Sequence, residues 1–368
     1  MKRAFLYELK RNLLPLVIFS VITAAVCLLA VSTTDVEHLT GYVSRNSCVW
    51  YFMAALMVLC TVVPVMQFSY RMHTRSVDLW YCLPISRKSL TLVRTLVGLI
   101  LVFVPYTLAY WLGVAGVAVQ QPKTFAFIWY LPNYFLSLVL GAGLFGVNAF
   151  LFTRANRASD GIVFMLAWGC ALAMLMWYLS EIFRFVIPYY DSRYGTTSYR
   201  YFSNLPVCFF TFGPIGWSAS LFDKFILTGA AEYSDWLTFG ISLGVGLAEA
   251  VAAYMLLFVY SERDKAENAA QISSSWWGYR VLLPFYLTLT VAMLDPTTFS
   301  YNYLFYGLSL IGAFILYFAY RRSFRLKKED IISILVCFVV GVALSIIAQN
   351  LSVEMVDNIY ILTVCLNC

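Results

Sequence analysis

The sequence predicts an all-α, polytopic membrane protein: a bundle of about nine transmembrane helices with the N-terminus in the cytoplasm. Three observations predict this fold class. Of the 368 residues, 61% are hydrophobic and only 12% are charged, too few to cover a water-soluble domain of this size. Charge-free stretches of about 20 residues, the length that crosses a bilayer as helix, recur along the chain. Basic residues gather in alternate loops, as the positive-inside rule requires.

The spans follow from the charge-free windows, which must be helical because lipid cannot satisfy a backbone amide. Seven windows are long enough, at residues 12–34, 46–70, 95–122, 124–153, 161–180, 296–320 and 331–353. An eighth, 236–261, is interrupted only by Glu249. The ninth, 281–294, is short, but Trp276 and Trp277 extend it past Arg280, whose stem can snorkel to the interface.

The segment 201–222 decides the orientation of everything after it. It carries no charge over its 22 residues, but Pro206, Gly213, Pro214 and Gly216 disfavour a continuous helix. If it does not cross, one side holds all but six of the 25 basic residues, the exceptions being Arg45, Lys123, Arg184, Arg193, Arg200 and Lys224. We therefore expect 184–235 to contain an external re-entrant hairpin, and the C-terminus to lie outside.

Several kinds of chemistry have no basis in the sequence. There is no Gly-Lys dipeptide and hence no P-loop, so the chain cannot bind ATP by that motif. With only His38 and His73, most histidine-based metal sites and catalytic triads are excluded. We expect no catalytic residues, no metal and no directly bound cofactor. The net charge of +6 needs no nucleic-acid partner, because it follows from topology and faces anionic membrane lipids.

Glu249 is the only Asp, Glu, Lys or Arg in the middle of a predicted span. An ionised carboxylate there is costly unless it is paired or faces a polar cavity, so Glu249 either lines a translocation path or is a protonated, hydrogen-bonded side chain. Its helix carries a ladder of small residues that permits close helix packing: Gly240, Gly244, Ala248 and Ala252. Pro105 is a second candidate for the path, because a proline bends a helix, although prolines are also ordinary in membrane bundles.

The first twelve residues predict an amphipathic helix that leads into the first span. Phe5, Leu6, Leu9 and Leu13 fall on one helical face, and the basic residues fall largely on the other. A simple positive-inside anchor explains the same pattern.

The segment 71–94, RMHTRSVDLWYCLPISRKSLTLVR, is the most informative loop. Arg71, Arg75 and Asp78 recur at helical spacing, and Pro84 opens a turn that Ser86 can cap as a helix start. We expect two short helices joined at Pro84. Such a loop can dock into a groove of a soluble partner, although a solvated basic face is the alternative.

The order of these features resembles the type-2 ABC exporter permeases. The features are an acidic residue before L-P-I-S-R, a basic helix into the third span, the N-terminal helix, the long outer segment, and Arg263-Asp264-Lys265-Ala266-Glu267 after the sixth span. The resemblance covers about residues 1–270. It implies a second permease subunit and two cytoplasmic ABC ATPase subunits, which would bind ATP and Mg. It also implies an ATPase-coupling site made of Arg71, Arg75, Asp78, Leu83, Pro84, Ser86, Arg87 and Lys88.

The resemblance sets the remaining expectations. Residues 1–12 would be a connector helix, 13–270 a six-span permease-like domain, and 271–368 three additional transmembrane helices, as in longer permeases of Gram-positive type. The expected function is export of a peptide, antibiotic or amphipathic molecule across the bacterial cell membrane. The alternatives are a membrane sensor or scaffold without transport, and an ion-coupled carrier that uses Glu249.

Overall fold

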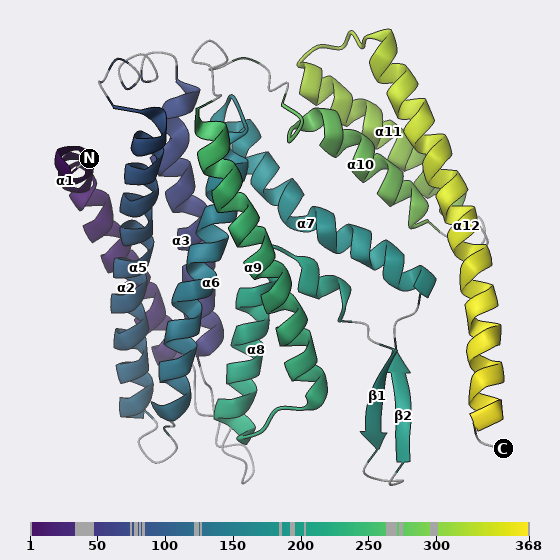
Figure 1. Ribbon diagram of the computed structural model, residues 1–368, viewed down its shortest axis with the longest axis horizontal. Coiled ribbons are helices and arrows are strands. Elements are labelled where there is room, and N and C mark those ends of the chain that lie inside the picture. Colours follow the sequence, from purple (N-terminus) through teal and green to yellow (C-terminus); the bar gives the residue numbers. More distant parts are fainter. Residues whose placement is uncertain are drawn as a thin grey trace. The chain divides into compact units, whose positions relative to one another are not determined.

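The computed structural model describes residues 2–33, 48–73, 76, 80, 82, 85–120, 125, 127–183, 186–191, 196–201, 204–262, 271, 275–294 and 301–366 (Figure 1). The long helices are α2 (Leu13–Thr33), α3 (Val49–Phe68), α5 (Arg87–Gln120), α6 (Phe127–Thr153), α7 (Ala158–Phe183), α9 (Tyr233–Ser261), α11 (Tyr301–Arg321) and α12 (Lys328–Leu366). Each coincides with a predicted span. Among the described residues, eight helices are long and apolar enough to cross a membrane. The chain is therefore a multi-pass membrane protein, and its fold is a helical bundle.

The remaining elements are short. The ninth predicted span corresponds to α10 (Tyr279–Ala292), whose 14 residues extend about 21 Å, less than the roughly 30 Å of a hydrocarbon core. The amphipathic N-terminal helix is present as α1 (Lys2–Arg11). The others are α8 (Gly213–Thr228) and two 3₁₀ turns, η1 (Ser69–Met72) and η2 (Pro206–Phe209).

A β-hairpin adds to the predicted all-α class. Strands β1 (Val186–Asp191) and β2 (Thr196–Tyr201) pair antiparallel, with Val186 opposite Tyr201 and Asp191 opposite Thr196. Their sequences, VIPYYD and TTSYRY, are rich in β-branched and aromatic residues, which favour strands. Hydropathy windows long enough to find membrane helices pass over such six-residue strands.

The chain forms two compact units. Unit 1 comprises residues 1–166 and 211–271, and unit 2 comprises 167–210 and 272–368, so α7 contributes to both. The predicted permease-like domain, 13–270, therefore differs from unit 1 in the placement of 167–210. The functional division into a permease domain and added helices stays a prediction.

In unit 1, α3 packs against α5, α6 and α8, and α2 packs along α5. The α3 residues Phe52, Met53 and Leu56 are fully buried in this core. Where α6 meets α9, Gly146 permits the closest approach, because a Cβ there would lie 2.4 Å from the Tyr254 ring. The Tyr254 hydroxyl donates to the Ala142 carbonyl of α6 at 2.8 Å.

The predicted small-residue ladder of α9 does not form this contact. A Cβ at Gly240 or Gly244 would meet no atom within 4 Å, and Ala248 and Ala252 are exposed. Within the described part of unit 1 the ladder therefore contacts no other helix, and the close packing that it permits stays a prediction. Four-residue spacing identifies a smooth helix face, but the neighbours in the fold decide which face is covered.

Helix α8 lies beside the first half of α9 and runs in the opposite direction. The external re-entrant position expected for this part of the chain stays a prediction. It begins beside the middle of α9, where the Pro214 ring lies against Gly246 so closely that a Cβ would be 2.4 Å away. It ends near the start of α9, where Lys224 Nζ contacts Asp235 Oδ1 at 2.5 Å. Gly229, with φ 75°, terminates α8 in the left-handed conformation that glycine adopts without strain.

Unit 2 is built around α10, which packs against α11 and α12. Val291 and Ile334 are fully buried there. Tyr178 of α7 donates to the Leu344 carbonyl of α12 at 2.9 Å. At the turn between α11 and α12, Arg321 forms a bidentate ion pair with Asp330, at 2.9 and 2.7 Å.

Candidate coupling site at the basic end of unit 1

The predicted coupling residues lie at the end of unit 1 where α3 finishes and α5 begins, which we call the basic end. Arg71, Ser86, Arg87 and Lys88 are described by the structure. The other predicted coupling residues, namely Arg75, Asp78, Leu83 and Pro84, lie outside the described residues.

The start of α5 confirms one prediction and corrects another. Ser86 caps the helix, since its Oγ accepts a hydrogen bond from the Ser89 backbone N–H at 3.2 Å. The second of the two expected short helices is instead the beginning of α5, which continues unbroken from Arg87 to Gln120. No proline or glycine separates Arg87 from the apolar window that begins at residue 95, so nothing in the sequence ends a helix there.

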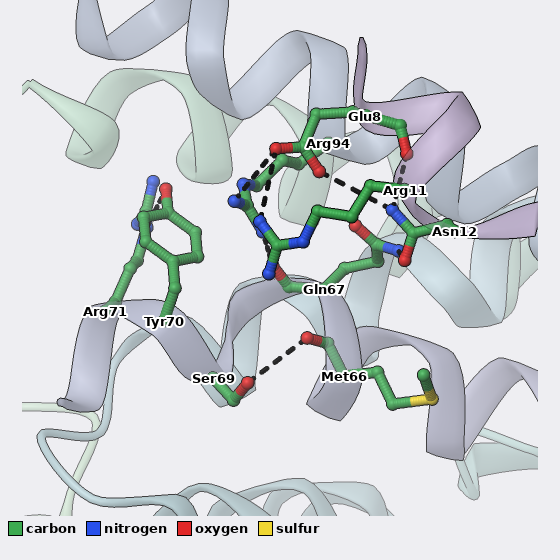
Figure 2. A network of polar contacts seen from close by, with 9 residues as sticks. All are labelled: Glu8, Arg11, Asn12, Met66, Gln67, Ser69, Tyr70, Arg71 and Arg94. Atoms are coloured by element: carbon green, nitrogen blue, oxygen red, sulfur yellow. Dashed lines mark hydrogen bonds and ion pairs between the residues drawn. The ribbon is translucent and has the colours of Figure 1, made fainter. Parts of the chain in front are cut away.

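A buried ion pair joins α1 to α5 (Figure 2). Arg94 Nη2 lies 3.2 Å from Glu8 Oε1, and the two side chains are only 3% and 2% exposed. Arg94 Nη1 also donates to the Gln67 carbonyl of α3 at 2.8 Å. The Arg94 guanidinium therefore connects three helices.

Aromatic rings surround the same guanidinium. The Arg94 Cζ lies 3.9 Å from the centroid of the Tyr70 ring and 4.4 Å from that of Trp80. Arg11 of α1 lies over Trp80 at 5.3 Å. Cation–π contacts of this kind stabilise a cation that has lost water, and Trp80 contributes its ring to both cations.

Amide side chains extend the contact between α1 and α3. Asn12 Nδ2 donates to the Glu8 carbonyl at 2.7 Å, and Gln67 Nε2 donates to Asn12 Oδ1 at 3.2 Å. We call the set Glu8, Arg11, Asn12, Gln67, Tyr70, Trp80 and Arg94 the Glu8–Arg94 network. Figure 2 shows these residues, except Trp80, around the Glu8–Arg94 ion pair.

Arg71 and Lys88 attach further segments of the basic end. Arg71 Nη2 donates to the Thr91 hydroxyl of α5 at 2.6 Å, so this predicted residue makes a structural contact with α5. Lys88 Nζ pairs with Glu262 Oε1 at 3.0 Å, and Arg87 Nη1 lies 3.5 Å from the Glu262 carbonyl. These two contacts connect the start of α5 to the end of α9.

Glu8 and Arg94 carry this site, yet neither was among the predicted coupling residues. A signal was present: Phe5, Glu8, Leu9 and Asn12 share one helical face, and this is the face that the structure covers. Leu6 and Leu13, which were expected on the apolar face with Phe5 and Leu9, are exposed. An acid on the apolar face of a basic helix indicates a buried partner cation elsewhere in the chain.

Glu249 belongs to α9 and lies near α6 and the start of α8, at a second polar position in unit 1. It accepts a hydrogen bond from Thr211, which precedes α8, and its Oε2 atom is buried without a hydrogen-bond partner. That region holds a cavity of about 20 Å³ lined by residues that include Gly143, Thr211, Pro214 and Glu249. A cavity of this size holds about one water molecule.

Pro105, the other candidate for the path, is buried inside α5. Its carbonyl lies 3.5 Å from the Thr23 hydroxyl of α2, so it packs at a helix contact. Within the described residues, no group of three or more His, Cys, Asp or Glu side chains is placed to hold a metal ion.

The chain matches no protein-family model, no curated protein and no solved structure. The resemblance to ABC exporter permeases therefore stays a prediction, and the case for function comes from the geometry of the basic end.

Proposed function

We propose that the chain is the membrane-spanning permease subunit of an ATP-binding cassette exporter. A partner ATPase, which holds the ATP and Mg, would drive export of a peptide, an antibiotic or another amphipathic molecule. A second permease subunit would complete the assembly in the bacterial cell membrane. The Glu8–Arg94 network is the observation that carries this proposal.

The network gives the 71–94 segment a mechanical link to the rest of unit 1. A displacement of this segment by a soluble partner is passed to α1 through Arg94 and Glu8, which lie 3.2 Å apart. It is passed to α9 through Lys88 and Glu262, which lie 3.0 Å apart. Coupling between sites travels through such contiguous contacts between rigid elements.

Helix α5 is the element that carries the displacement across the bilayer. Its 34 residues form one continuous helix, about 51 Å long, which exceeds the thickness of the membrane. Motion at Arg87 would therefore be transmitted along α5 to its other end. Because the coupling residues Arg87 and Lys88 belong to the same helix as the span, no flexible linker separates them from it.

An ion-coupled carrier is the second candidate, and Glu249 favours it. An unpaired buried oxygen beside a cavity that fits one water is a place where a proton or a small cation can bind. The two candidates differ in energy source, since the exporter needs ATP and the carrier needs an ion gradient.

The test is affinity purification of the tagged chain from native membranes, followed by mass spectrometry and an ATPase assay. We expect a P-loop ATPase to co-purify, and Arg87→Glu to reduce the recovered activity severalfold. Arg325→Glu, on the turn between α11 and α12, is the matched control and should leave activity unchanged. If the wild-type chain recovers no ATPase, the exporter proposal fails. Efflux that survives ATP depletion and is lost in Glu249→Gln would instead support the carrier.

A further inference from the structure

One face of α10 forms a groove of about 420 Å³, lined by Arg280, Val281, Pro284, Phe285, Thr288 and Leu289. These positions recur at intervals of three and four residues, so they follow one side of the helix. All of them belong to unit 2, and none takes part in the coupling site.

The groove has a charged end and an apolar body. Arg280 is exposed at the first turn of α10. The half-buried Val281, Pro284 and Phe285 supply apolar surface, and the buried Leu289 closes the far end. Thr288 is the one other polar residue, and its hydroxyl donates to the Pro284 carbonyl at 2.8 Å. The Thr288 hydroxyl therefore has a hydrogen-bond acceptor within the helix and does not require a water molecule in the groove.

The length of the groove matches one leaflet of a bilayer. From Arg280 to Leu289 the helix rises by about 14 Å, and half of a hydrocarbon core is about 15 Å. An acyl chain whose headgroup lies at Arg280 would thus follow the groove for its whole length.

Arg280 has neighbours of the kind that lie among lipid headgroups. The rings of Tyr279 and Tyr320 are 5.1 Å apart, so the start of α10 lies at the same end of unit 2 as the turn between α11 and α12. This turn exposes Arg325, Lys327 and Lys328. Aromatic side chains flank the cations, with Trp276 76% and Phe324 91% exposed. Exposed cations with aromatic residues are typical of the membrane interface.

We propose that the α10 groove binds a phospholipid with an anionic headgroup. The Arg280 guanidinium would pair with the lipid phosphate and headgroup, and one acyl chain would lie against Val281, Pro284 and Phe285. Charge complementarity at one end and apolar length at the other select an amphiphile, and arginine is suited to phosphate oxygens. This site is independent of the proposed export function.

The test is native mass spectrometry of the full chain, released from detergent with equimolar phosphatidylglycerol and phosphatidylethanolamine. The wild type should retain phosphatidylglycerol preferentially. Arg280→Gln should lower this preference by about fivefold, the effect of one basic group near an anionic surface. Arg280→Lys should retain it within about twofold, which keeps the test valid if the glutamine variant folds poorly. Val281→Trp should reduce retention of both lipids, because the indole occupies the groove.

Arg325→Gln is the matched control, since Arg325 is an exposed cation at the same end but does not line the groove. It should change the preference by less than about twofold. Equal losses in Arg280→Gln and Arg325→Gln would show diffuse attraction to the membrane surface and overturn the proposal. So would a wild type without preference, or displacement of the bound lipid by excess inorganic phosphate.

Discussion

The Glu8–Arg94 pair gives the sharpest prediction. Both side chains are almost completely buried and lie 3.2 Å apart. Removing one partner leaves an uncompensated buried charge, whereas replacing both by apolar residues removes the charge and the need for a partner. We expect Glu8→Leu and Arg94→Met each to lower the free energy of unfolding by about 3–5 kcal/mol. The double variant should lie within about 1–2 kcal/mol of the wild type.

The contacts of Arg94 and Glu8 explain these magnitudes. Its guanidinium loses a partner carboxylate in Glu8→Leu but keeps the Gln67 carbonyl at 2.8 Å and the Tyr70 ring at 3.9 Å. Those contacts offset only part of the cost, because neither carries a negative charge. In Arg94→Met the buried Glu8 carboxylate keeps only weak contacts, with Arg11 at 3.7 Å and with Asn12 at 3.5 Å.

The assay is a double-mutant cycle measured by reversible unfolding of the purified chain in mixed micelles. A coupling energy of at least about 4 kcal/mol between the two positions is the expected result, because two losses of about 3 kcal/mol or more would collapse to about 2 kcal/mol or less in the double variant. Single-variant losses that add within about 0.5 kcal/mol in the double variant would refute the reasoning. Lys88→Ala is a useful reference, because its ion pair is more than half exposed on both sides.

Three further predictions concern the rest of unit 1. Lys88→Ala should cost less than about 1 kcal/mol of unfolding free energy in the same micelle assay, because exposed ion pairs are weak, yet lower ATPase coupling in the co-purified complex. Gly146→Ala should lower the free energy of unfolding by about 1–3 kcal/mol, because its Cβ would lie 2.4 Å from the Tyr254 ring. The control Gly240→Ala places its Cβ in open space and should be neutral or stabilising. Equal effects of the two substitutions would contradict the packing argument. Glu249→Gln should keep the unfolding free energy within about 1 kcal/mol, because the amide can still accept from Thr211, whereas Glu249→Ala should enlarge the cavity and cost more. If the alanine variant is as stable as the glutamine variant, the Thr211 contact contributes little.

The sequence by itself determined where the long apolar helices lie. Apolar windows must become helices in lipid whatever their neighbours are, since their amides have no other partners. Ser86 could also be identified as a helix cap, because the capping motif is complete within four residues. Local chemistry is sufficient for both predictions.

Only the tertiary structure decided which residues meet. Glu8 and Arg94 are 86 positions apart, and no local pattern pairs one buried acid with one particular arginine. Spacing identified the ladder that contains Gly240 and Gly244 as a smooth face, but the neighbouring helix α6 packs beside Ala250 and Tyr254 instead. Helix periodicity defines several possible faces, and packing energy, which depends on every helix at once, selects the one that is buried.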